Sequence, residues 1–214
     1  MSGIILNVVG GTFGAPVPSG IGAAYGGGYY AGSISTVGNS VADFYLVVGP
    51  VASAQNASKQ WKTANTTTTG TTSVIDGPAN STAMNNASHP AAQFCEGLTI
   101  GGFSDWYMPA KNELDVCYYN LKPTTTSNNT GVGINANAVP ERTSNYTAGT
   151  PAQTSATDFQ STGAEDFAAG PYYWASTERS ATTGWMQVFN SGYQSNYGTK
   201  TGYYSVRAIR RVAV

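Results

Sequence analysis

The residues best equipped for chemistry lie near the carboxyl end, in the stretch FNSGYQSNYGTKTGYYSVRAIRR. Tyrosine offers a large, rigid and amphipathic contact surface, and serine, asparagine and glycine add adaptable hydrogen bonding, as in antibody paratopes. We therefore expect this stretch to form a surface for non-covalent recognition. Its candidate receptor-binding residues are Tyr193, Ser195, Asn196, Tyr197, Lys200, Tyr203 and Tyr204.

The alternative for the same stretch is a twisted hairpin whose rings belong partly to the core. Consecutive side chains of a strand point to opposite faces, so one member of the pair Tyr203 and Tyr204 is expected to be buried. Trp106, Trp174 and Trp185 also lie in strand-like or helix-flanking motifs. We predict that these three indoles are core, because large aromatic residues in such positions more often pack than bind ligand.

Few residues support a catalytic interpretation. Glu178 and Arg207 each follow a strand-like motif. We expect them to form a structural ion pair, because an acid and a permanently charged guanidinium make a poor general acid–base couple. His89, the one histidine, precedes Pro90 at an expected helix start, and we predict local hydrogen bonds for it. The sequence predicts no enzyme: no catalytic residue, no cofactor and no metal site.

The two cysteines, Cys95 and Cys117, lie in helix-like stretches and have no metal-ligand spacing. The favoured interpretation is that both are small buried hydrophobic residues. A disulfide between packed helices is the alternative.

Composition limits the classes of partner. Charged residues make up 10% of the 214 residues, and the formal net charge is −1; an ordinary soluble domain has roughly 25% charged residues. So few charges leave no electrostatic footprint for nucleic acid or an anionic membrane. No apolar run approaches the length of a membrane span. We therefore expect neither nucleic-acid binding nor membrane insertion.

The elements that must position these residues follow an α+β order. Apolar and β-branched runs predict strands at 26–34, 43–50, 171–177, 184–189 and 203–212. Helical spacing predicts helices within 89–98 and 105–121. Residues 59–86 and 122–168 are rich in Thr, Ser, Asn and Gly and read as long loops, the second of them functional because of its length. Before the compact domain at 21–214, residues 1–20 combine a short apolar strand, IILNVV, with a Gly/Pro connector. We interpret 1–20 as an attachment segment.

Four motifs in matching order, GGFSDWYMPAKNEL, YYWASTE, GWMQVF and the terminal VRAIRR, resemble one bacterial and phage domain family. That family includes the C-terminal domain of a bacterial collagen-like adhesin and many phage tail proteins. IGAAYGGGYYAGSI followed by YLVVGPVAS is similar to the phage members, so the resemblance covers residues 21–214. Ala110 and Ala175 depart from the hydroxyl residues common in the family.

The resemblance implies a C-type-lectin-like fold: an α+β domain with a mixed, mostly antiparallel sheet, two helices and long irregular loops. Its first and last strands would pair, and the binding surface would lie between the YYWASTE strand and the terminal strand. Some relatives are targets of diversity-generating retroelements, which favour Asn, Tyr, Ser and Asp there. The triplets that hold calcium in calcium-dependent lectins are absent, so no calcium-bridged sugar site is expected.

The implied function is host attachment by a virion tail, baseplate or fibre-tip protein. The receptor would be a glycan or an outer-membrane protein, residues 1–20 would join other tail proteins, and copies would form a homo-oligomer, with a trimer favoured. MSGIILNVVGG lacks the basic region of a secretory signal, so synthesis in the host cytoplasm is expected. The alternative is a structural virion cap or decoration protein that makes no receptor contact. A bacterial surface adhesin is a third interpretation.

Overall fold

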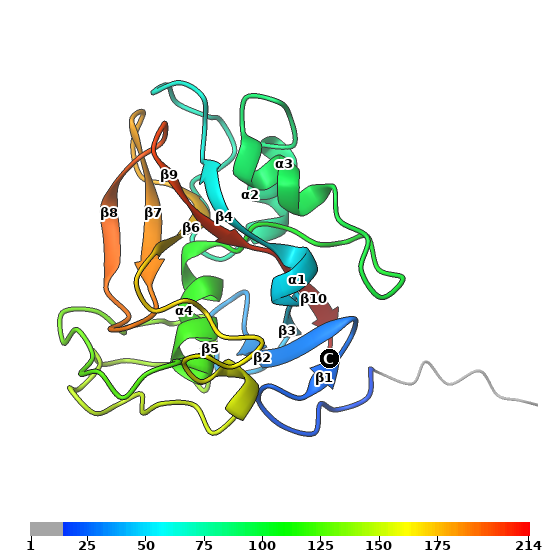
Figure 1. Ribbon diagram of the computed structural model, residues 1–214, viewed down its shortest axis with the longest axis vertical. Coiled ribbons are helices and arrows are strands. Elements are labelled where there is room, and N and C mark those ends of the chain that lie inside the picture. The colour runs from blue at the N-terminus through cyan, green and yellow to red at the C-terminus, as the bar shows by residue number, and fades with distance from the viewer. Residues whose placement is uncertain (1–14) are drawn as a thin grey trace, which may run out of the picture.

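The computed structural model describes residues 15–214, which form a mixed α and β structure of two mostly antiparallel sheets and a few helices (Figure 1). The apolar strand expected within residues 1–20 lies outside the described residues. Within residues 15–214, none of the helices has the length and apolar character needed to traverse a bilayer.

The first sheet has the order β1-β2-β3-β10, and β5 pairs with β2. All of its pairs are antiparallel. Its strands are β1 (Ala24–Tyr25), β2 (Gly28–Ile34), β3 (Phe44–Val48), β5 (Ala138–Val139) and β10 (Ile209–Ala213).

The family resemblance implied that the first and last strands pair, but among the described residues they do not. β10 lies beside β3, with Ile209 opposite Val48, and β2 lies on the other side of β3. Leu46, Val47 and Val48 are fully buried, so β3 needs a hydrogen-bonded partner at both edges. The C-terminal strand β10 therefore supplies one of the two partners of β3, which is the second strand predicted from the sequence.

The second sheet has the order β4-β9-β6-β7-β8, and β8 is an edge strand. β6 and β9 run parallel, and the other pairs are antiparallel. The sequence did not reveal β4 or β8, because QNASKQ and QSNYGT lack alternating apolar residues. The strands are β4 (Gln55–Gln60), β6 (Tyr172–Glu178), β7 (Thr183–Val188), β8 (Gln194–Thr199) and β9 (Tyr203–Arg207).

The predicted single strand at 203–212 is divided between the two sheets. β9 belongs to the second sheet and β10 to the first, and Ala208 lies between them. The Ala208 amide donates to the carbonyl of Ala54 at 2.9 Å, and its carbonyl accepts the amide of Gly49 at 3.0 Å. One continuous run of chain thus joins the sheets, as the long red segment in Figure 1 shows.

The two predicted helices are present as α3 and α4, and a further helix, α2, falls in the stretch expected to be a loop. Asp76 caps α2 by accepting the amide of Ala79, a local signal that the Thr/Asn-rich composition obscured. At α4, Glu113 accepts the amide of Ala110 at 2.8 Å, but the alanine methyl group cannot return the bond. The helices are α1 (Val51–Ala54), α2 (Gly77–Ala83), α3 (Pro90–Glu96), α4 (Lys111–Leu121) and the 3₁₀ turn η1 (Thr157–Phe159).

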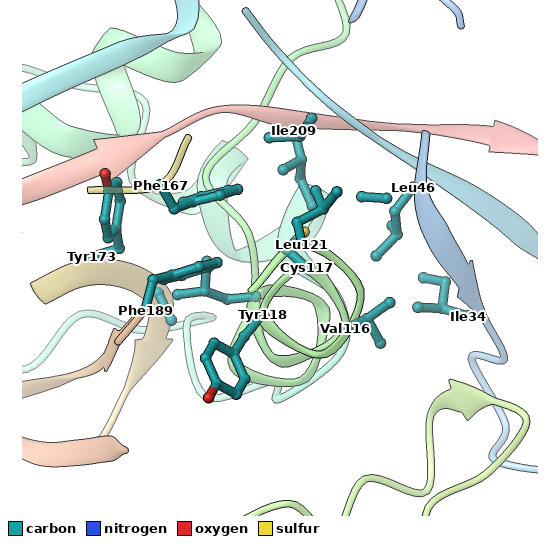
Figure 2. Close-up of a cluster of buried hydrophobic side chains, with 14 of the residues drawn as sticks. Ile34, Leu46, Val116, Cys117, Tyr118, Leu121, Phe167, Tyr173, Phe189 and Ile209 are labelled. Atoms are coloured by element: carbon teal, nitrogen blue, oxygen red, sulfur yellow. The ribbon is translucent and has the colours of Figure 1, made fainter. Parts of the chain in front are cut away.

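Helix α4 runs through the centre of the molecule and packs against both sheets. Figure 2 looks along it: Val116 points toward Ile34 and Leu46 of the first sheet, and Tyr118 extends on the side of Phe189. Phe167 and Phe189 stack with ring centroids 3.9 Å apart. Side chains are buried around most of this helix, as expected for one enclosed by the core.

Several predictions about buried residues are confirmed. Cys95 and Cys117 are buried and free, so they pack as small hydrophobic residues and form no disulfide. Trp106 and Trp174 are core residues, with exposed fractions of 1% and 0%. Trp185 packs against the core but is only partly buried, because it also lines the candidate site described below.

The expected ion pair between Glu178 and Arg207 is wrong. Arg207 is fully buried and donates from Nη2 to Glu165 Oε2 at 2.8 Å. Glu178 pairs instead with the buried amine of Lys200. Each charge therefore has a partner, but the partners come from segments that sequence patterns could not connect.

Strand register keeps the two residues apart. β6 and β9 are parallel with Tyr173 opposite Ser205, which sets Arg207 beside Ala175. Glu178 lies three residues further along β6, about 10 Å away at roughly 3.3 Å per residue. Each side chain meets a nearer partner instead, Glu165 for Arg207 and Lys200 for Glu178.

His89 makes the local hydrogen bonds expected of it. Its side chain is buried; Nε2 lies 2.9 Å from Thr68 Oγ1, and Nδ1 lies 2.9 Å from Asn86 Oδ1. Burial, together with the nearby amines of Lys62 and Lys200, lowers the pKa of His89 to about 4. The imidazole is therefore neutral at physiological pH.

The lowered pKa of His89 predicts a loss of stability in mild acid. The unfolded chain binds a proton at His89 near pH 6.5, whereas the folded protein does so only near pH 4. The free energy of unfolding should therefore fall as pH decreases from 6.5. A His89→Gln variant should lose this dependence. Urea unfolding between pH 7 and 5 measures the free energy of unfolding of both proteins. If that free energy changes equally with pH in the two proteins, the assignment to His89 is contradicted.

Candidate functional site

An open hollow of about 520 Å³ lies where β7 and β8 face the loop of residues 131–134. In Figure 1 β8 is the orange strand at the left edge, and loops of the segment that follows α4 lie below it. We call it the β8 hollow. It is lined by Lys111, residues 131–134, Asn145, Trp185, Tyr193, Gln194, Asn196 and Tyr197.

Strand β8 supplies one wall of the hollow. Gln194 and Asn196 are partly buried and line it, and Tyr197 is 76% exposed at its rim. Gly198 turns toward the core, where an added Cβ would lie 2.6 Å from the indole of Trp174. The strand thus presents polar and aromatic side chains outward while its glycine allows close packing inward.

Trp185 lines the hollow and is only partly buried, while it also packs against the core cluster, so the prediction of a core residue is met only in part. Its neighbours on β7, Gly184 and Met186, are buried, and strand alternation turns Trp185 to the opposite face. The Lys111 amine lies 5.2 Å from the centroid of the indole ring, within cation–π range. The alternation in TGWMQV was the signal that could have revealed this orientation.

Lys111 and Asn145 were also missed. Lys111 is the first residue of α4, and Asn145 lies within the long segment that follows it. Neither lies in the tyrosine-rich stretch, and no local pattern distinguishes them. Tertiary folding alone brings them to β8.

The loop that forms the opposite wall is fixed by one buried carboxylate. Asp115 of α4 accepts hydrogen bonds from Arg142, from Tyr146 Oη and, at 2.8 Å, from Asn135 Nδ2. Gln187 of β7 approaches the same carboxylate at 3.4 Å. Asp115 thereby ties residues 135–146 to the central helix and to the strand that carries Trp185.

The turn before β8 is tied to the same loop. The Asn129 amide donates to the Ser191 carbonyl at 2.8 Å, and Tyr118 of α4 donates to Asn128. Gly192 adopts φ 71°, and an added Cβ would collide with the Tyr118 ring at 2.2 Å. Both walls of the β8 hollow therefore rest on α4.

Two of the predicted receptor-binding residues are buried. Ser195 is 6% exposed, and its hydroxyl accepts the amide of Tyr197 at 3.3 Å. Lys200 is 0% exposed; its amine contacts Glu178 and lies 4.6 Å from the centroid of the Trp61 ring. The prediction that Ser195 and Lys200 form exposed contact surface is wrong, because both side chains are buried: Lys200 pairs with an interior acid, and Ser195 bonds to the backbone of its own strand.

Tyr203 and Tyr204 lie on β9, away from the residues that line the hollow. Tyr203 is 65% exposed, whereas Tyr204 packs edge-on against Trp174 with ring centroids 4.9 Å apart. Tyr204 is thus the member of the pair that turns inward, although it is only partly buried. Of the predicted set, the hollow gathers Tyr193, Asn196 and Tyr197.

Comparisons with known proteins give little further guidance. No family model and no curated protein match the chain. Among solved structures, the chain is similar to a fimbrial protein from Bacteroides ovatus, with 13% sequence identity and a TM-score of 0.45. The alignment covers 80% of this chain and 36% of that one, so this chain spans about a third of the fimbrial protein's length.

Replacing Lys200 should affect stability rather than recognition. Lys200→Met leaves the Glu178 carboxylate buried without its cation, and breaking a buried pair in this way costs about 3–5 kcal/mol. Urea unfolding should show that loss, and adding Glu178→Gln should recover part of it. A Lys200→Met protein of unchanged stability would contradict the buried pairing.

Replacing Asp115 should loosen the loop wall of the hollow. Asp115→Asn removes the charge that Arg142 and Tyr146 contact, so we expect faster amide hydrogen exchange across residues 128–147 and about 1–3 kcal/mol lower stability. Asp158→Asn, at an exposed carboxylate, is the matched control. Unchanged exchange in the Asp115 variant would show that other contacts hold the loop.

Proposed function

We propose that the protein is a receptor-binding component of a phage tail, with a C-type-lectin-like domain at residues 21–214. The motifs shared with phage members of the adhesin-related family support this assignment. So does the long irregular segment between α4 and β6, which carries part of the β8 hollow.

The observation that carries the function is the set of groups gathered at the hollow. Trp185, Tyr193 and Tyr197 supply rings that can stack or pack, and Asn145 and Asn196 supply amides that can donate and accept hydrogen bonds. Such a combination suits recognition of a molecule presented at a cell surface. The chemistry proposed is non-covalent binding.

The support beneath the hollow favours binding without large rearrangement. α4 holds one wall through Asp115 and the other through the contact of Tyr118 with Gly192. A surface organised before binding loses less conformational entropy on forming a complex. Attachment through residues 1–20 and assembly of copies about a symmetry axis, with a trimer favoured, would multiply a modest single-site affinity.

Removing the rings of the hollow should abolish selective attachment to cells. We expect Tyr193→Ala/Tyr197→Ala to weaken binding about tenfold or more, because aromatic residues dominate binding hot spots. Tyr203→Ala, at an exposed ring outside the hollow, should bind as the parent does. Binding of the fluorescently labelled, assembled protein to a panel of bacterial strains is the measurement.

The same experiment separates attachment from a structural role. Loss of strain-selective binding in the folded double variant, with Tyr203→Ala unaffected, supports the proposal. Failure of the assembled protein to bind any strain contradicts receptor binding and favours a virion cap or decoration protein. Undiminished binding by the double variant excludes the β8 hollow as the contact site.

A further inference from the structure

The β8 hollow contains a cation without a carboxylate partner. Among residues 15–214, no carboxylate oxygen lies within 4 Å of the Lys111 amine, whose one side-chain hydrogen bond is a long 3.4 Å contact with Asn112 Oδ1. Lys122 is buried without an acid as well, but its amine donates to the carbonyl oxygens of Thr126 and Pro151. The remaining cations that lie largely in the interior do have carboxylate partners. They are Arg142, Lys200, Arg207, Arg210 and Arg211.

Lys111 is unpaired because its nearest acid on the helix is already occupied. Asp115 lies one turn further along α4, but its oxygens accept bonds from Arg142, Tyr146 and Asn135. The Lys111 side chain lies instead beside the indole of Trp185 and is partly buried. Burial lowers the pKa of Lys111, which is the direction expected for an ammonium lacking a counter-ion.

The surroundings of Lys111 fit an anion carried on a sugar ring. The described residues that line the hollow include no acid, and the nearby Asp115 carboxylate is already paired with Arg142. Trp185 and Tyr193 offer faces for the C–H surface of a pyranose, and Asn145 and Asn196 match its hydroxyl groups. A volume of about 520 Å³ lies in the range of small-ligand sites, roughly 300–1,000 Å³.

We propose that the β8 hollow binds an anionic saccharide unit of a cell-surface polysaccharide, with the Lys111 amine contacting its carboxylate or phosphate and Trp185 packing on the ring. This inference rests on the proposed function and specifies its receptor class. A charge-assisted contact to the amine supplies preference for the charged sugar over its neutral parent. Because the hollow is open, the preference should weaken with added salt.

The test uses immobilised saccharides in matched pairs: trigalacturonate with galactotriose, sialyllactose with lactose, and phosphorylated with unphosphorylated mannan fragments. We expect at least one anionic member to bind about tenfold more tightly than its neutral partner, and the carboxylate and phosphate pairs identify the group recognised. Lys111→Gln should erase that preference, and Lys111→Arg should retain most of it. No binding by any anionic member, or equal binding within every pair, overturns the inference.

The matched control is Lys59→Gln. Lys59 is also a partly buried lysine over an aromatic ring, 5.8 Å from the centroid of Phe94, but it lies on β4 outside the hollow. The Lys59→Gln variant should bind saccharides and cells as the parent does. If Lys111→Gln binds cells as the parent does while Tyr193→Ala/Tyr197→Ala does not, the anionic-saccharide inference fails and receptor attachment stands. If the tyrosine variant also binds normally, the β8 hollow is not the contact site and the inference fails, while receptor attachment through another surface stands.

Discussion

The carboxylate of Asp115 is the constraint on which the candidate site depends. It sits on the helix that fills the core and collects donors from Arg142, Tyr146 and Asn135, residues of a segment with almost no regular structure. Burying a carboxylate is costly unless it accepts hydrogen bonds. The hydrogen bonds that satisfy Asp115 also hold the loop in place. The loop can therefore be irregular in backbone and still fixed in position.

Buried charges with specific partners also explain the unusual composition. Only 10% of residues are charged, yet several of those charges are internal: Arg207 with Glu165, and Lys200 with Glu178. Ion pairs inside a protein are costly to desolvate and demand particular partners, so they specify how segments meet more than they add stability. The outer surface is rich in threonine, serine and asparagine, which form hydrogen bonds with water but carry no net charge.

The sequence predicted what depends on local patterns. Helical spacing located α3 and α4, and apolar and β-branched runs located β6 and β7, because these patterns lie in consecutive residues. It failed where a residue's environment comes from distant chain. Lys200 was read as surface because nothing near it reveals Glu178. Trp185 was read as core, which is met only in part, and its alternation with Gly184 and Met186 carried the signal of its partial exposure. Tyr193, Asn196 and Tyr197 were found through composition, whereas Lys111 and Asn145 required the fold.

The passage of one strand run through both sheets has a mechanical consequence. β9 and β10 are separated only by Ala208, and every residue of β10 is paired with β3. A force that separates the two sheets along this run therefore loads several backbone hydrogen bonds at once rather than opening them one by one. The two sheets are thereby coupled through the backbone as well as through side-chain packing.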